Sequence, residues 1–174
     1  VQDTGNQGIV SIEAENYLNQ IERSSHEWLF DNSFAGFSGT GYMECLPNTG
    51  LNISSNYSTD SPELTYDIQF NKTGTHYIWI LATGPSGSDD SLHIGLNGSE
   101  EDGVYKVDIN EESGTWGWSD TAQAGRATIE IPTTGTYTLN LWMREDGSLI
   151  DKIVLTTDST YVPSGQGPAQ SPTM

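Results

Sequence analysis

Most of the chain consists of short runs in which apolar and polar residues alternate, and a period of two is typical of β-strands with one buried face. No run keeps a helical period over three turns. The predicted strands are 9–15, 41–45, 63–70, 75–82, 91–96, 104–109, 126–131, 136–143 and 149–156. Many short strands separated by glycine-rich turns indicate an all-β domain, and we expect a two-sheet β-sandwich of the jelly-roll type.

Two of these strands begin in the same way. In 70–77 and again in 131–137, one strand ends, the chain turns on a glycine (Gly74 or Gly135), and an aromatic-rich strand begins. Glycine suits such turns because it adopts backbone conformations that other residues avoid. If both strands run in the same direction, the loops at their far ends, 83–90 and 144–148, lie at the same end of the domain.

The length and the two ends indicate one domain of a larger protein. The 174 residues are enough for a single domain with a full core. Residues 1–8 and the Pro-, Gly-, Ser- and Gln-rich residues 159–174 are predicted to be linkers that flank a folded domain at 9–158. We expect a secreted or extracellular monomer whose single cysteine, Cys45, is a buried thiol.

The charge balance limits the partners. The chain has 6 Lys and Arg against 24 Asp and Glu, a formal net charge of −18. Nucleic acids and anionic membranes attract basic surfaces, so neither is expected as a partner. A neutral ligand is favoured, and the acidity is compatible with a marine, high-salt habitat.

Two carboxylates stand where a strand normally carries apolar residues. Glu13 and Glu15 are two positions apart, so they point to the same face of an extended strand. Like charges side by side are unfavourable unless a cation lies between them, and basic residues are scarce here. We predict a structural Ca²⁺ with Asp151, beside the closing strand, as a third ligand. The alternative is that these are solvated carboxylates on an edge strand.

Three motifs carry a resemblance to a known class. Ile-Glu-Ala-Glu-Asn-Tyr at 12–17, Phe-Ser-Gly-Thr-Gly-Tyr at 37–42 and Asp-Lys-Ile-Val-Leu at 151–155 resemble non-catalytic carbohydrate-binding modules of families six and thirty-five. The resemblance covers roughly 9–158. It implies a galactose-binding-like β-sandwich joined to the catalytic domain of a polysaccharide-degrading enzyme, and a calcium ion held by Glu13, Glu15, a carbonyl near Ser38, and Asp151.

The resemblance also implies a glycan cleft between loops, with an aromatic platform and a polar residue just before the last strand. Trp116 or Trp118 matches the aromatic position, and loop 144–148 matches the polar one, although it reads Arg-Glu-Asp-Gly-Ser where many members of the class have Asn. A tryptophan ring offers a large flat surface for the C–H face of a sugar. The alternative for either tryptophan is packing in the core.

Other candidates for the ligand site come from loops. The long aromatic segment 24–39 carries His26, Trp28, Phe30 and Phe34 and is either a binding loop or a lid folded over the sandwich. The acids in loop 83–90 either accept hydrogen bonds from sugar hydroxyls or belong to a solvated turn. The charged residues of the loop before the last strand either bind a sugar or form a local ion pair. The charged residues concerned are Asp89, Asp90, Arg144, Glu145 and Asp146.

These observations favour a non-catalytic polysaccharide-binding module that directs an attached enzyme to a neutral polymer such as xylan, β-glucan or an agarose-like galactan. A protein-interaction or adhesion module on the same sandwich is the first alternative. The second is a small glycoside hydrolase or lyase using Glu145 and Asp146, which is disfavoured because adjacent residues of one short loop are poorly placed to flank a scissile bond.

Overall fold

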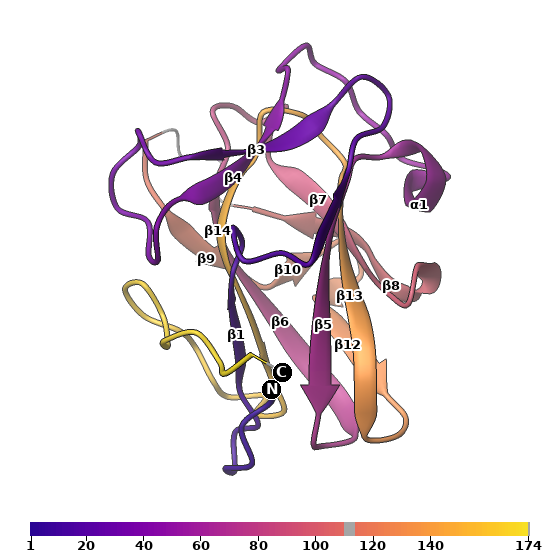
Figure 1. Cartoon of the computed structure of the whole chain (residues 1–174), viewed down its shortest axis with the longest axis vertical. Helices are drawn as coiled ribbons and strands as arrows, with labels where there is room; N and C mark the ends of the chain where they lie inside the picture. The colour runs from indigo at the N-terminus through magenta and orange to yellow at the C-terminus, as the bar shows by residue number, and fades with distance from the viewer. Residues whose placement is uncertain (110–113, 174) are drawn as a thin grey trace.

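The computed structural model describes residues 1–109 and 114–173, and these residues form a sandwich of two antiparallel β-sheets (Figure 1). The first sheet runs in the order β12 (Thr128–Ile131), β6 (Gly74–Thr83), β14 (Leu149–Thr156), β4 (Tyr42–Leu46) and β3 (Glu27–Asp31). Two further strands join it: β1 (Val10–Glu13) pairs with β14, and β9 (Gly117–Ser119) pairs with β6.

The second sheet lies across from the first and carries the short helix on its outer side (Figure 1). Its order is β11 (Gly125–Arg126), β10 (Thr121–Ala122), β8 (Ser99–Asp108), β7 (Ser91–Leu96), β13 (Gly135–Met143), β5 (Glu63–Phe70) and β2 (Asn19–Ile21). The helix α1 is a single turn, Tyr57–Asp60. Within the described residues, no helix is long and apolar enough to cross a membrane.

The core lies between the sheets and follows from the alternation in the sequence. The fully buried side chains of the first sheet include Ile78, Ile80, Ile153 and Leu155, and those of the second include Leu92, Ile94, Leu139 and Leu141. Each such aliphatic side chain contributes about 1.5–3 kcal/mol when it leaves water. The expected two-sheet β-sandwich is therefore confirmed.

Several short strands that sequence periodicity did not indicate also belong to the sandwich, among them β2, β3 and β9. β3 lies inside the segment expected to be an irregular loop, and β2 and β9 have only three residues each. Such strands are too short to show a period of two on their own. They form because a neighbouring strand supplies the hydrogen-bond partners, as β4 does for β3 along Glu27 to Asp31.

The loops that follow β6 and β13 meet at one end of the sandwich, as the paired turns predicted. The amide of Asp90 donates to the carboxylate of Glu145 across this junction, with an N–O distance of 3.3 Å. Gly74 adopts a φ of 93° at the start of β6, where a side chain would be strained. The opposite end of the molecule, where β6 and β13 finish, gathers the loops that frame the candidate site.

Both terminal segments pack on the sandwich, whereas the sequence suggested linkers. Gln2 is buried, and its side-chain carbonyl accepts from the amides of Asn71 and Lys72. Residues 163–173 lie along β1, and the termini are neighbours in Figure 1. The side chains of Ser171 and Gln170 accept from the amides of Ser11 and Glu13 on the free edge of β1. These contacts satisfy donors that an uncovered edge strand would leave to solvent; Met174 lies outside the described residues.

Candidate functional site

A cleft of about 310 Å³ opens at the loop end of the first sheet. Its floor comes from β4 and the start of β14, and its sides come from the loops after β3 and β6. The described residues that line it are Asp31, Ser33, Phe34, Tyr42, Glu44, Thr83, Gly84, Pro85, Gly114 and Leu149. The lining thus combines aromatic rings, carboxylates and a backbone turn, which is the mixture found in small polar ligand sites.

One of the two predicted tryptophans packs against the aromatic residues of the cleft. The ring centroid of Trp116 lies 5.5 Å from that of Phe34 and 5.3 Å from that of Tyr42. Its indole nitrogen donates to the carbonyl of Ala35, which fixes the ring to the 31–41 loop. Trp116 is not itself a lining residue of the cleft, and it supports the two rings that are.

The polar groups of the cleft are two carboxylates with different surroundings. Asp31 accepts hydrogen bonds from the hydroxyls of Ser33 and Tyr42, which lower its pKa to about 2. Burial, and then the charge of Asp31, raise the pKa of Glu44. No Lys, Arg or His stands among the described lining residues, so the cleft carries net negative charge.

Trp118 lies elsewhere, on the same sheet but under the C-terminal segment. Its indole nitrogen donates to the carbonyl of Gly165 at 2.9 Å. A side chain at Gly167 would come within 2.6 Å of the Trp118 ring, so the segment passes directly over it. Trp118 anchors this segment and does not line the cleft.

Two predicted loop residues serve the interior of the protein. Trp28 is fully buried, and its indole nitrogen donates to the carbonyl of Pro62. His26 is also buried, with its Nε2 3.0 Å from the Asp146 carboxylate and its Nδ1 2.8 Å from the carbonyl of Ser24. The structure corrects the prediction that these side chains face a ligand: Trp28 pairs with the buried Cys45 on β4, and this register turns it to the core.

The charged loop before β14 ties neighbouring loops together. Asp146 has no exposed surface and accepts hydrogen bonds from Thr49, Gly50 and His26. Burial opposes ionisation of Asp146, but hydrogen bonds led by the Thr49 amide outweigh it, and its pKa falls. Arg144 donates to both Glu145 and Ser91 at 2.6 and 2.7 Å. These residues brace the site from behind and do not line the cleft.

The acids of loop 83–90 take part in the same bracing. Asp89 is buried and accepts from the side chains of Asn48 and Ser86. Burial, and then the adjacent Glu145, raise the pKa of Asp90 to about 6. Burial works against ionisation of Glu145 as well, but hydrogen bonds led by Ser91 lower its pKa, so the negative charge of the pair resides on Glu145. Neither aspartate lines the cleft.

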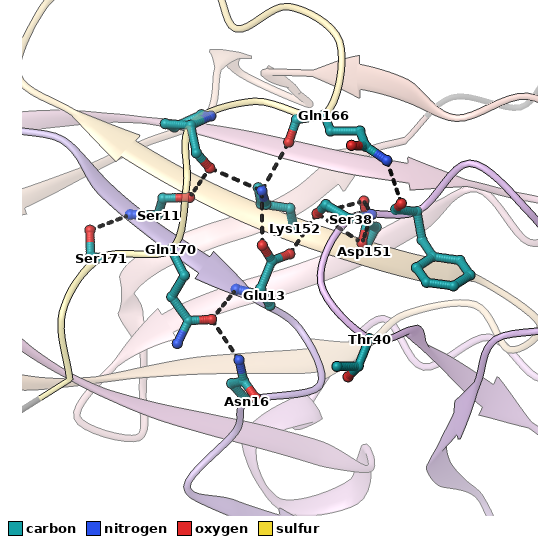
Figure 2. A network of polar contacts seen from close by, with 12 residues as sticks. Ser11, Glu13, Asn16, Ser38, Thr40, Asp151, Lys152, Gln166, Gln170 and Ser171 are labelled. Atoms are coloured by element: carbon teal, nitrogen blue, oxygen red, sulfur yellow. Dashed lines mark hydrogen bonds and ion pairs between the residues drawn. The ribbon is translucent and has the colours of Figure 1, made fainter.

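Two of the predicted metal ligands, Glu13 and Asp151, meet at Ser38, as Figure 2 shows. The amide of Ser38 donates to both oxygens of Asp151 at 3.1 and 3.0 Å, and its hydroxyl donates to Glu13 at 2.6 Å. Glu15 accepts from the amide of Thr40 at 2.7 Å. A side chain at Gly39 would collide with Glu15, at 2.4 Å, and press on the carboxyl of Glu13, at 3.2 Å. The three acids therefore surround one loop.

The charges in this region are only partly balanced. Lys152 lies 3.0 Å from one oxygen of Glu13, and both side chains are nearly buried (Figure 2). The second oxygen of Glu15 is buried without a hydrogen-bond partner among the described residues. Burial, and to a lesser degree the charge of Glu13, raise the pKa of Asp151 to about 7. In the described part of the chain, no group of three His, Cys, Asp or Glu is close enough to count as a metal cluster.

The fold is similar to that of solved β-sandwich carbohydrate-binding modules of families six and thirty-five. A module of Cellvibrio mixtus lichenase 5A, solved with cellotriose, superposes with a TM-score of 0.59 at 14% identity over 86% of this chain and 97% of that one. The C-terminal family-six module of a laminarinase from Zobellia galactanivorans has a TM-score of 0.57 at 18% identity, over 86% and 99%. A family-thirty-five module from Clostridium thermocellum has a TM-score of 0.58 at 12% identity, over 84% and 96%.

Residues 4–170 match the model of the glycosyl hydrolase family 115 C-terminal domain, and the chain belongs to that family. A curated relative, the uncharacterized protein P23 of Formosa agariphila, is 29% identical over 192 residues. The match covers 92% of this chain and 46% of the relative, so the chain spans about half the length of the curated protein that it matches.

Sequence reasoning missed the cleft residues Asp31, Tyr42 and Glu44, and left Phe34 open between a ligand site and a lid. The alternation in the predicted strand 41–45 places Tyr42 and Glu44 on the face opposite Met43 and Cys45, which are fully buried. An acidic residue, Glu44, on the outward face of a predicted strand was therefore a signal that could have indicated the cleft. That Glu44 lies near Phe34 could not be predicted, because it depends on the pairing of β3 with β4.

Proposed function

We propose that this domain is a non-catalytic module that binds a polysaccharide in the cleft between β4, the 31–41 loop and the 83–85 turn. The observation that carries the proposal is the cleft itself, where the half-buried ring of Phe34, packed against Trp116, stands beside two carboxylates and the buried Tyr42. Aromatic rings pack on the C–H faces of sugars, and carboxylates accept hydrogen bonds from their hydroxyls. An open polar site of this size is expected to bind with Kd of about 10⁻³ to 10⁻⁵ M.

The role of such a module is to hold an attached catalytic domain near its substrate. Tethering converts the encounter of enzyme and polymer into a local event and raises the effective concentration of the substrate. The net charge of −18 supports a neutral polymer, such as xylan, β-glucan or an agarose-like galactan, over an acidic one. A secreted or extracellular location fits this role.

Acid–base chemistry at Glu145 and Asp146 is not supported by their surroundings. Both carboxylates are buried and receive hydrogen bonds from neighbouring loops. A glycosidase needs its two carboxyl groups on opposite sides of an accessible bond, about 5–9 Å apart. The charged loop before β14 is therefore assigned a bracing role, and polysaccharide binding is proposed for the cleft alone.

We also propose a structural Ca²⁺ held by Glu13, Glu15 and Asp151. Supporting it are the buried oxygen of Glu15 that has no hydrogen-bond partner among the described residues, and the buried Asp151 that shares Ser38 with Glu13. Carboxylate oxygens, together with the predicted carbonyl near Ser38, suit a hard cation. Such an ion would fix the end of β1 and the 38–40 loop to β14, and this loop continues into the loop that carries Phe34.

The test is affinity gel electrophoresis of the chain on neutral and acidic polysaccharides, together with a glycan array, with and without EDTA. We expect retention on a neutral polymer. Trp116→Ala should weaken it at least tenfold while the fold, followed by circular dichroism, is preserved. Trp118→Ala is the matched control, because Trp118 lies under the C-terminal segment and should leave affinity unchanged. Equal retention of wild type and Trp116→Ala contradicts the cleft, and no retention on any polymer favours a protein-interaction module.

A further inference from the structure

Glu44 is placed in the cleft by the alternation of β4. Its neighbours Met43 and Cys45 point into the core and are fully buried, so the side chain of Glu44 points to the opposite face. It pairs with Leu149 on β14 and with Leu29 on β3, in the middle of the sheet. This position holds the carboxylate on a rigid strand, where a loop would allow it to move away from a ligand.

The carboxylate of Glu44 has no hydrogen-bond or ion-pair partner in the part of the chain that the structure describes. The contrast with Asp31 on the same cleft is clear, because Asp31 accepts bonds from the hydroxyls of Ser33 and Tyr42 and from two backbone amides. Asp31 is thus occupied by the protein, whereas Glu44 is half-buried and keeps its acceptor positions open. The Glu44 oxygens are not among the buried polar atoms that lack a partner, so they reach solvent and are available to the hydroxyls of a ligand.

We propose that Glu44 is a specificity-determining residue of the cleft, which accepts hydrogen bonds from the hydroxyls of an uncharged sugar and repels sugars that carry a carboxylate. The inference rests on the proposed function and deepens it, because it names the residue that would select neutral over acidic polymers. Asp31 adds a second negative charge, and no cation among the described lining residues opposes the two.

The size of the effect follows from the charge and the partial burial. A second negative charge within a few ångströms, in a half-buried site at physiological salt, lowers affinity by about a factor of ten. A hydrogen bond to an ionised acceptor is stronger than one to a neutral amide by an amount that corresponds to about fivefold in affinity. Glu44→Gln keeps the shape of the side chain and an acceptor oxygen but removes the charge.

The experiment titrates wild type, Glu44→Gln and the control Glu27→Gln with four probes. These are xylotriose, xylotriose carrying a glucuronate branch, cellotriose, and its C6-oxidised triuronate. Glu27 lies on the adjacent strand β3 and does not line the cleft, so its variant makes the same change in net charge away from the site. Thermal unfolding of each variant confirms that the fold is intact.

We expect the wild type to prefer the neutral member of a pair at least tenfold. Glu44→Gln should bind the neutral sugar about fivefold more weakly and the acidic one about tenfold more tightly, while Glu27→Gln matches the wild type. If binding depends on Trp116 but the ratio of neutral to acidic affinity is the same in Glu44→Gln, the inference about Glu44 is wrong and the proposed function stands. Failure of the wild type to bind any probe and any neutral polymer of the glycan array, or binding that Trp116→Ala leaves unchanged, overturns the function and the inference with it.

Discussion

The buried lysine of β14 gives a prediction whose size can be worked out from its contacts. Lys152 is 3% exposed, lies 3.0 Å from a carboxylate oxygen of Glu13, and donates to the carbonyls of Gln166 and Pro168 at 2.9 and 3.0 Å. Lys152→Met keeps the length of the side chain but leaves the 8%-exposed Glu13 unpaired and removes the donor from two carbonyls of the C-terminal segment. Removing one partner of a buried pair costs about 3–5 kcal/mol.

The assay is equilibrium unfolding in urea, monitored by tryptophan fluorescence. EDTA is present throughout, so that no metal ion contributes to stability. A loss of that size in a chain of this length corresponds to a fall in Tm of about 6–20 °C. Hydrogen exchange of residues 163–173 should also quicken, because the variant loses the link between the segment and β14. Lys72→Met is the control, since the Lys72 ammonium makes one exposed bond of 3.3 Å to the carbonyl of Asn6.

A double variant separates the ion pair from the two carbonyl bonds. Glu13→Gln combined with Lys152→Met removes both charges, so the combined loss should be smaller than the sum of the single losses by about 1–3 kcal/mol. A loss below about 1 kcal/mol in Lys152→Met, or one equal to that of Lys72→Met, would refute the reasoning that this lysine is what docks the C-terminal segment.

Two further predictions concern the metal and pH. Calcium added to EDTA-treated protein should raise its Tm, and Asp151→Asn should abolish the rise. Equal Tm values with and without calcium would contradict the proposed metal site. Burial, reinforced by the charge of Arg144, lowers the pKa of His93 to about 4. Between pH 6.5 and 4, His93 binds a proton in the unfolded chain but not in the folded one. The free energy of unfolding should therefore fall by at most about 3 kcal/mol as the pH drops from 6.5 to 4. Urea unfolding of His93→Phe measures this, since the difference between its pH profile and that of wild type isolates His93; parallel profiles would contradict it.

Much of the fold was readable because it depends on local periodicity. The strands β5, β7 and β14 were predicted with the bounds they have, and the paired glycine turns placed loops 83–90 and 144–148 at one end. The sandwich then follows, because strands with one apolar face must bury it against another sheet. The gathering of Glu13 and Asp151 around Ser38 was also readable, through the period of two and the resemblance to known modules.

The division of side chains between core, cleft and bracing depended on tertiary contacts. A lone tryptophan in a short strand has no visible period, so only the register of β3 with β4 sends Trp28 to the core. Trp116 and Trp118 look alike in sequence and share a strand spacing, yet one contacts Phe34 and the other is covered by Gly167. An acidic residue in a loop can accept hydrogen bonds either from a ligand or from backbone amides. In the folded chain, Asp146 accepts them from the amides of Thr49 and Gly50.

Composition and local alternation predict an acidic all-β sandwich and the acids at the end of β1, because these are properties of neighbouring residues. Long-range contacts set the other features: Glu44 faces a cleft, Lys152 holds the C-terminal segment, and the end of this segment pairs with β1. The physical reason is that such contacts join residues far apart in the chain, and their free energies depend on burial and partners that exist only once both sheets have formed.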